Sequence, residues 1–170
     1  MKTAVVYYSL EGNCALAARI LGEIFAFQTG EKADLFEIQT ADTKKRRGLR
    51  KFLWGGGQVL MGSKPALQPL DFDPAAYGLV VVGTPVWAAS PAPPVRAFLE
   101  KTPIRGKRIA LFICHAGGKG RALEKLEALL PGNECAGGID LVNPSGNLQG
   151  LQAKLEAWVE TLRGSAPAPA

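Results

Sequence analysis

Short apolar runs of strand length recur along the chain, and segments with apolar residues at helical spacing follow most of them. Runs of β-branched, aromatic and aliphatic residues are typical of strands buried inside a sheet. The second run alternates apolar and polar residues, as a more exposed strand does. The predicted strands are Thr3–Tyr8, Ala33–Ile38, Leu79–Val82, Arg108–Cys114 and Ile139–Val142.

The intervening segments carry apolar residues on one helical face. Leu16, Ile20 and Ile24 are spaced four residues apart and predict a helix over Asn13–Phe27. A pair of prolines further along the chain is suited to begin the next helix. One further predicted helix begins at Pro93–Pro94, and two more cover Leu123–Leu130 and Leu151–Leu162.

This alternation predicts a single α/β domain over residues 1–163, with a flexible tail of Gly, Ser, Ala and Pro at 164–170. Strand–helix alternation is typical of a parallel sheet with helices on both faces, here a three-layer α/β/α sandwich with a five-stranded sheet. Such sheets bind ligands beyond the carboxyl ends of their strands, where the crossovers change direction. The segments after the first, third and fourth strands therefore form the candidate site.

The segment after the first strand has the features of a phosphate loop. It reads Ser9-Leu10-Glu11-Gly12-Asn13-Cys14 and leads directly into a predicted helix. A tight turn at a helix start exposes backbone N–H groups, and the helix dipole adds positive potential, so the turn favours an anion. An ordinary turn in which Ser9 or Asn13 caps the helix fits the same residues.

Two further segments are suited to a flat ligand. The segment after the third strand reads Gly83-Thr84-Pro85-Val86-Trp87-Ala88 and is stiffened by prolines. Its indole can stack on a ring or cap the core. The segment after the fourth strand, His115-Ala116-Gly117-Gly118, is small enough for its backbone to approach a ligand. His115 can donate a hydrogen bond there or face solvent.

Better-known phosphate motifs are absent from the chain. Neither G-x-x-x-x-G-K-[ST] nor G-x-G-x-x-G occurs, which argues against a P-loop NTPase and a dinucleotide site. Cys14 and Arg19 form C-x4-R, one residue short of the C-x5-R loop of low-molecular-weight tyrosine phosphatases. The arginine would therefore point out of such a loop.

The positive charge is concentrated in one segment. The chain has 20 Lys and Arg residues against 15 Asp and Glu residues, a net charge of +5. Seven of the basic residues and none of the acidic ones lie between Thr43 and Leu70. A nucleic-acid binder would be basic more uniformly. The cluster from Lys44 to Lys51 fits an acidic partner, an anionic substrate or a solvated face.

The remaining composition argues against metal and membrane binding. Cys14, Cys114 and Cys135 form no C-x-x-C pair, and the chain has 1 His, so we expect no metal site. No stretch reaches the ~18 apolar residues that a membrane span needs. The first residues lack the layout of a signal peptide. We therefore expect a reduced, cytoplasmic protein.

Taken together, the three segments resemble the ligand loops of the flavodoxin family. The resemblance covers roughly Met1 to Arg163 and implies strand order 2-1-3-4-5, with FMN bound non-covalently. It implies that the phosphate lies on the first loop, the isoalloxazine beside the second and its pyrimidine edge on the third. The implied FMN-binding residues are Ser9, Leu10, Glu11, Gly12, Asn13, Cys14, Thr84, Pro85, Val86, Trp87, Ala88, His115, Ala116, Gly117 and Gly118.

Two features depart from the pattern of that family. The family loop is commonly Thr/Ser-x-Thr-Gly-x-Thr, whereas Glu11 and Cys14 replace two hydroxyl residues here. Because a carboxylate repels phosphate, we expect Glu11 to offer its backbone N–H and turn its side chain outward. Electron-carrying flavodoxins are acidic, whereas this chain is basic. Between the second and third strands, Trp54 is expected to pack in a small satellite core or cover the flavin.

The resemblance implies electron transfer through FMN, with a redox protein or a small acceptor as partner. The basic Lys44–Lys51 cluster would suit a partner that is acidic or anionic. The flavin carries such chemistry, so no side chain is required as a nucleophile or base. Two alternatives stay open. One is an FMN-dependent oxidoreductase that passes hydride from NAD(P)H to a quinone. The other is a non-redox binding module that has lost FMN. Both a monomer and a homodimer are compatible with the chain.

Overall fold

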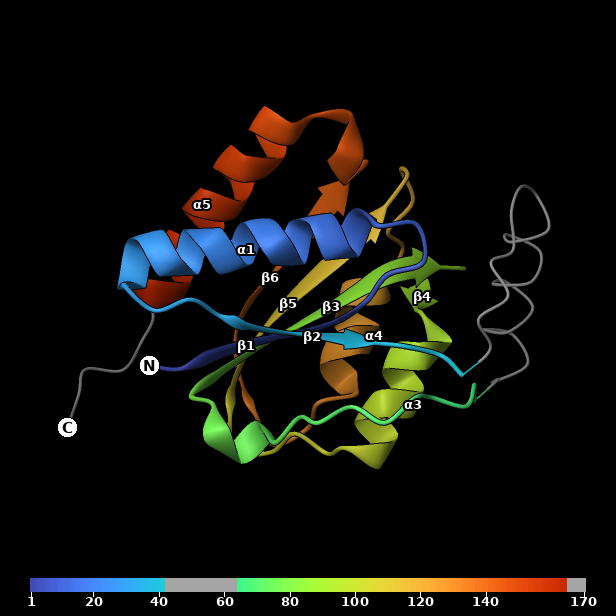
Figure 1. Cartoon of the computed structure of the whole chain (residues 1–170). Coiled ribbons are helices and arrows are strands. Elements are labelled where there is room, and N and C mark those ends of the chain that lie inside the picture. Colours follow the sequence, from blue (N-terminus) through green and yellow to red (C-terminus); the bar gives the residue numbers. More distant parts are fainter. Residues whose placement is uncertain (42–63, 165–170) are drawn as a thin grey trace.

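The computed structural model describes residues 1–41 and 64–164 (Figure 1). The Lys44–Lys51 cluster, Trp54 and residues 165–170 lie outside the described residues, so the predictions made for them stay predictions. The long elements are β1 (Thr3–Tyr8), α1 (Asn13–Thr29), β2 (Asp34–Ile38), β3 (Leu79–Trp87), α3 (Pro93–Lys101), β5 (Arg108–His115), α4 (Ala122–Ala128), β6 (Glu134–Val142) and α5 (Leu148–Gly164). The short ones are the 3-10 turns η1 (Pro74–Ala76) and η2 (Pro144–Gly146) and strand β4 (Ser90–Pro91).

The sheet has the predicted fold class and strand order. Its five long strands are parallel and lie in the order β2-β1-β3-β5-β6, which is 2-1-3-4-5 when these five are counted along the chain. The prediction missed β4, which pairs antiparallel with the end of β3. The switch in crossover direction falls between β1 and β3, so this sheet edge is the place for a ligand.

Two apolar layers hold helices on opposite faces of the sheet. In Figure 1, α1 and α5 lie on one face, and α3 and α4 lie on the other. Alternate residues of β1 serve the two layers: Val5 packs on the α1/α5 side and Val6 on the α3/α4 side. This burial on both faces explains why the central strands are continuous apolar runs. Among the described residues, no helix is long and apolar enough to cross a membrane.

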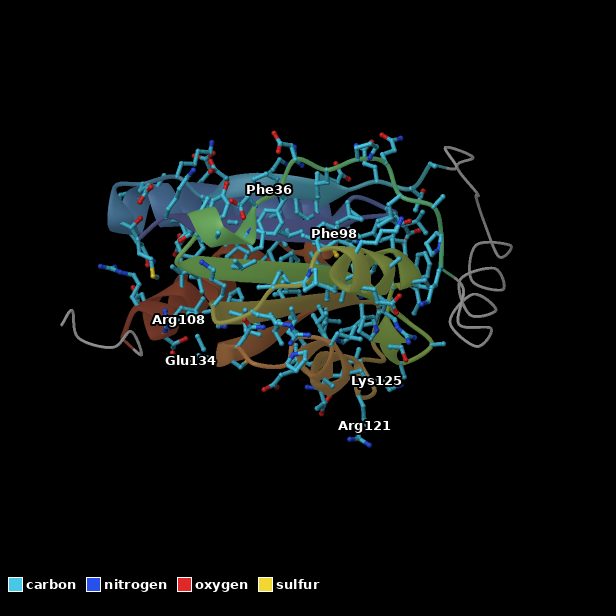
Figure 2. The ribbon with its side chains drawn as sticks, turned by 90° about the horizontal axis from the view of Figure 1, so that it is seen from below. Phe36, Phe98, Arg108, Arg121, Lys125 and Glu134 are labelled. Carbon is cyan, nitrogen blue, oxygen red and sulfur yellow. The ribbon has the colours of Figure 1, made fainter. Side chains whose placement is uncertain are left out.

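Aromatic side chains thicken the layer under α3. Figure 2 shows Phe36 and Phe98 in this layer. The ring of Phe72 links them, with ring centroids 5.0 Å from Phe36 and 6.0 Å from Phe98. At the other side of the same view, Arg108 and Glu134 lie at the starts of β5 and β6, with Arg108 Nε 3.8 Å from Glu134 Oε1.

The third strand is longer than the sequence predicted. It continues beyond Val82 to Trp87, so the segment expected to be a loop is the end of a strand and a hairpin. Gly83, expected to end the strand, lies within it and pairs with Phe112 of β5, whose ring covers the glycine backbone. A Cβ atom at Gly83 would lie 2.0 Å from Phe112 Cζ. The pairing of β3 with β5 continues as far as Pro85 and Cys114.

Smaller differences occur at other ends. The last strand begins at Glu134 and not at Ile139, with an irregular register opposite Ile109–Leu111. Gly138 lies in this added part, where a Cβ atom would be 2.7 Å from Leu123 Cδ2 of α4. Tight packing under α4 therefore requires glycine within the strand, which hides the strand from a search for apolar runs.

Candidate functional site

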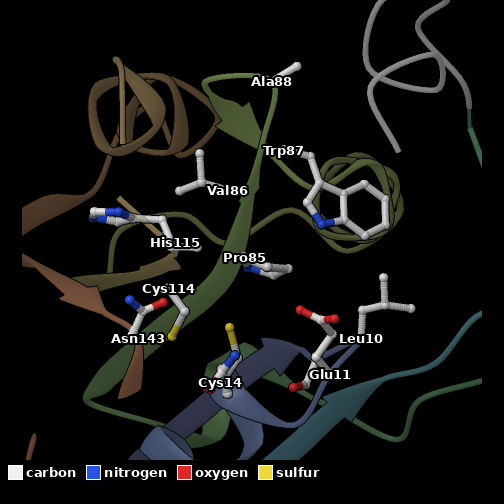
Figure 3. Close-up of a pocket in the computed structure, with 13 residues that line it drawn as sticks. Leu10, Glu11, Cys14, Pro85, Val86, Trp87, Ala88, Cys114, His115 and Asn143 are labelled. Atoms are coloured by element: carbon white, nitrogen blue, oxygen red, sulfur yellow. The ribbon is translucent and has the colours of Figure 1, made fainter. Parts of the chain in front are cut away.

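One pocket lies at the carboxyl ends of the central strands and collects residues from all three predicted segments (Figure 3). Its volume is about 380 Å³. That volume is in the range of sites for small molecules and cofactors. The pocket is lined by Ser9, Leu10, Glu11, Asn13, Cys14, Pro85, Val86, Trp87, Ala88, Cys114, His115, Ala116 and Asn143.

The first loop is a tight turn held by Ser9. Gly12 has a φ of +92°, a left-handed conformation that favours glycine, and no side chain caps the helix at this residue. Ser9 Oγ accepts hydrogen bonds from the N–H groups of Gly12 at 3.1 Å and Ala15 at 3.2 Å. Ser9 therefore has the capping role that the sequence left open. These two hydrogen bonds use the lone pairs of the Ser9 oxygen and leave its O–H available to donate to an anion.

Asn13 ties this loop to the segment after β6. Its Oδ1 accepts a hydrogen bond from the N–H of Ser145 at 3.3 Å, in η2. The side-chain amide nitrogen of Asn13 therefore faces away from that contact and can donate to a ligand. The position of the loop thus depends on the ends of β1 and β6 and not on β1 alone.

Glu11 differs from its expected orientation. Its side chain is exposed, yet it lines the pocket, and Figure 3 shows the carboxylate on the pocket side, near Leu10 and below Trp87. The expectation that this side chain turns outward is therefore wrong. A negative charge at this position lowers the affinity of the loop for an anion.

The end of β3 forms an apolar wall that ends in an indole. Trp87 is half-buried and packs edge-to-face on Tyr8, with ring centroids 5.9 Å apart and an angle of 84° between the planes. Burial, assisted by Glu37, raises the pKa of Tyr8 to about 12, so its phenol stays neutral. Trp87 both covers the core through Tyr8 and lines the pocket, so the two roles considered from the sequence coexist.

A strained hairpin carries this wall. Ala88 and Ala89, between β3 and β4, have φ angles of +46° and +55°. Both central residues of a type I′ hairpin turn need a positive φ, which is unfavourable for alanine. The hydroxyl of Thr84 accepts a hydrogen bond from the Ala92 N–H at 3.0 Å and donates to the Pro85 carbonyl at 3.0 Å. Thr84 is fully buried and braces the hairpin without lining the pocket.

The third loop is fixed by its own histidine. His115 Nδ1 accepts a hydrogen bond from the Gly117 N–H at 3.1 Å, and Nε2 faces Asp140 Oδ2 at 3.5 Å. The His115 side chain is 6% exposed, so its place is set by these contacts and not by solvent. The expected choice between ligand contact and solvent is thus too simple, because His115 lines the pocket and also folds the loop.

Asp140 is in turn held by two lysines. Lys119 Nζ lies 3.4 Å from its Oδ1, and Lys154 Nζ donates to its backbone carbonyl at 2.6 Å. Burial raises the pKa of Asp140, but the positive charges of Lys154 and Lys119 outweigh it, so the pKa is lowered overall. The carboxylate is therefore ionised at neutral pH.

Most of the predicted residues line the pocket, and four do not. Gly12, Thr84, Gly117 and Gly118 shape the loops and do not contribute to the lining. Two lining residues were not predicted: Cys114, which was taken as the last residue of a buried strand, and Asn143, which follows β6. The position of Asn143 just after a strand was a usable indication, since ligands gather at such ends.

Cys14 and Cys114 meet in the wall of the pocket. Both are free and buried, and the Cys14 thiol hydrogen-bonds the Cys114 side chain. Burial, followed by this neighbouring thiol, raises the pKa of Cys14 well above its ordinary value. Within residues 1–41 and 64–164, no group of three or more His, Cys, Asp and Glu side chains could hold a metal ion.

Comparison with protein families and solved structures gives a consistent result. The family model described as flavodoxin matches residues 2–162. The flavoprotein from Lactobacillus acidophilus, solved in complex with FMN, is 23% identical, with a TM-score of 0.67 over 85% of this chain and 94% of that one. Two-electron reduced Megasphaera elsdenii flavodoxin is 16% identical, with a TM-score of 0.58 over 93% and 98% of the two chains. An archaeal flavodoxin is also 16% identical, with a TM-score of 0.56 over 96% and 99%. The curated proteins contain no match.

Proposed function

Since the chain belongs to the flavodoxin family, we propose that its pocket binds FMN non-covalently and that the bound flavin transfers electrons to a redox protein or a small acceptor. FMN is the cofactor of this family, in agreement with the cofactor expected from the sequence. Flavins supply one-electron and hydride transfer, while the protein binds and orients them.

The observation that carries the proposal is the convergence of three loops on one pocket. Three surfaces surround a pocket of about 380 Å³: a turn with exposed amides, an aromatic wall and a loop of small residues. A phosphate, a flat ring and a polar ring edge require these three surfaces. The residues present therefore fit FMN.

The first loop would hold the phosphate. The helix N-terminus behind Gly12 favours an anion through its backbone N–H groups and dipole. The Ser9 hydroxyl and the Asn13 amide nitrogen add side-chain donors. The negative charge of the Glu11 carboxylate repels the phosphate. The affinity for FMN therefore depends on the balance between these hydrogen-bond donors and that repulsion.

The other two loops would hold the ring system. Trp87 offers an aromatic edge or face, and Pro85 and Val86 continue the apolar wall. His115 and Ala116 lie on the opposite loop. A ring bound against these apolar surfaces would exclude water from them, which would strengthen the remaining polar contacts.

A fluorescence titration tests cofactor binding. FMN added to purified protein should lose its emission with a one-to-one endpoint, because a ring beside an indole is quenched. Riboflavin, which lacks the phosphate, is the matched control and should bind more weakly. If neither compound binds, the chain is a non-redox module and the proposal fails.

A second measurement tests the electron-transfer role. The flavin-loaded protein should accept electrons from a flavin reductase or from dithionite. It should oxidise NADPH or NADH only slowly when a quinone is the acceptor. Rapid steady-state turnover of either nicotinamide with the quinone would identify an oxidoreductase and would contradict a carrier role.

A further inference from the structure

Two thiols that lie far apart in the sequence, Cys14 and Cys114, share one wall of the pocket. Cys14 lies in the first turn of α1 and Cys114 near the end of β5. They belong to the same apolar layer, and their side chains form a hydrogen bond. Figure 3 shows both sulfur atoms side by side at the pocket. The FMN contacts proposed above assign no role to either thiol.

We propose that Cys14 and Cys114 can be oxidised to a disulfide, with loss of two electrons, by a small, neutral thiol oxidant that enters through the pocket. The oxidant belongs to the class of azodicarboxamides, of which diamide is the probe. This property is separate from flavin chemistry, because it needs only the two thiols and an open pocket.

The oxidation balances without any other reactant. The sulfur of one thiol, as thiolate, adds to one nitrogen of the N=N double bond, and that thiol's proton goes to the other nitrogen. The second thiol then attacks the first sulfur, the S–N bond breaks and the S–S bond forms. The second proton goes to the nitrogen that leaves. Two electrons pass from the two sulfurs to the azo group, which becomes a hydrazine.

The pocket controls which reagents reach the pair. Cys14 is 1% exposed and Cys114 4% exposed, and both residues line the pocket. Buried thiols are normally inert because reagents cannot reach them. Here the remaining access leads through the pocket, so a small neutral oxidant that enters the pocket can reach both thiols. A ligand in the pocket should close this route.

Cys135 is the internal control. It is half-buried on β6 and packs on the α3/α4 side of the sheet, away from the layer that contains the pair. It should therefore form no intramolecular disulfide with either pocket cysteine. Cys135→Ser should leave the reaction of the pair unchanged.

The test uses the full chain, with and without FMN. The protein is treated with diamide, blocked with N-ethylmaleimide, denatured and digested with trypsin. We expect the number of alkylated thiols to fall from three to one. We also expect a disulfide-linked product of the tryptic peptides 3–19 and 109–119, which contain Cys14 and Cys114. Cys14→Ser and Cys114→Ser should each abolish the linked product.

The FMN arm separates this proposal from the proposed function. FMN at ten times its dissociation constant should slow the closure about tenfold by mass action. If the disulfide closes at the same rate with FMN present, the pair is supported and FMN docking in this pocket is contradicted. If all three thiols stay free, or if every link joins two chains or includes Cys135, the pair is contradicted whatever FMN does.

Discussion

His115 Nδ1 accepts a hydrogen bond from the backbone N–H of Gly117 at 3.1 Å. An acceptor at Nδ1 means that a neutral imidazole carries its proton on Nε2, the atom that faces Asp140 Oδ2 at 3.5 Å. The imidazole is therefore a brace between β6 and the loop after β5. With the proton on Nε2, Nδ1 is available to accept the Gly117 N–H that folds the loop.

The tautomer gives the first prediction. Nitrogen NMR of the unloaded protein at pH 8 should show the proton of His115 on Nε2. His115→Ala should weaken FMN binding about fivefold, since one net hydrogen bond is worth about 1 kcal/mol. His115→Asn, which keeps an acceptor oxygen, should weaken FMN binding less than His115→Ala does. A proton found on Nδ1 would contradict the brace.

Glu11 gives the second prediction. Glu11→Gln removes a negative charge from the pocket wall and should tighten FMN binding about fivefold at low salt, because unit charges about 4 Å apart in water interact by about 1 kcal/mol. Fluorescence titration measures the affinity. The gain should shrink at high salt, where screening shortens the range of the repulsion.

The matched control for that charge is Glu23→Gln. Glu23 lies on α1, the helix that follows the Glu11 loop; it pairs with Lys32 at 2.6 Å and does not line the pocket. The Glu23→Gln substitution should leave the affinity for FMN unchanged. Weaker binding by Glu11→Gln would mean that the carboxylate supports the loop and does not oppose the phosphate.

The hairpin gives the third prediction. Ala89 has a φ of +55°, so Ala89→Gly should raise the free energy of unfolding by about 1 kcal/mol, the order of the penalty for an L residue in that conformation. Chemical denaturation measures it. The same substitution at Ala26, inside α1, should lower stability by about 1 kcal/mol. Equal losses at both positions would show that the turn is not strained.

Acid pH gives the fourth prediction. The pKa of Asp140 is lowered below its ordinary 3.8, because the two lysines outweigh burial. A lowered pKa adds stability above the unfolded value, and that stability disappears as the pH falls through the folded value. Asp140→Asn should therefore be less stable than the parent protein at pH 7, and the difference should shrink as the pH falls below 3.8. A difference that is independent of pH would contradict this ionic role.

The sheet was predictable because its signals are local. Runs such as Thr3–Tyr8 are buried on both faces of the sheet, so nearly every residue in them is apolar and the strand can be recognised from the run alone. The extension of β3 was not predictable in this way, since Gly83 and Pro85 are poor strand residues. Their place in the strand comes from pairing with β5, and Gly83 is needed because Phe112 lies on it.

The pocket was predictable in outline and not in detail. The topological rule located three loops, and residues of all three line it. The rule could not show that the Thr84 hydroxyl would bond to Ala92 or that Glu11 would line the pocket, since both depend on tertiary contacts and loop geometry. Asn143 was missed because the search stopped at the fourth predicted strand.

The most direct test of FMN in this pocket is a titration of isotope-labelled protein followed by backbone amide NMR. FMN should shift the amides of residues 9–14, 86–88, 114–116 and 143, in slow exchange, while amides on the outer faces of α3 and α4 stay in place. Shifts confined to other surfaces, or no shifts with FMN in excess, would contradict the account.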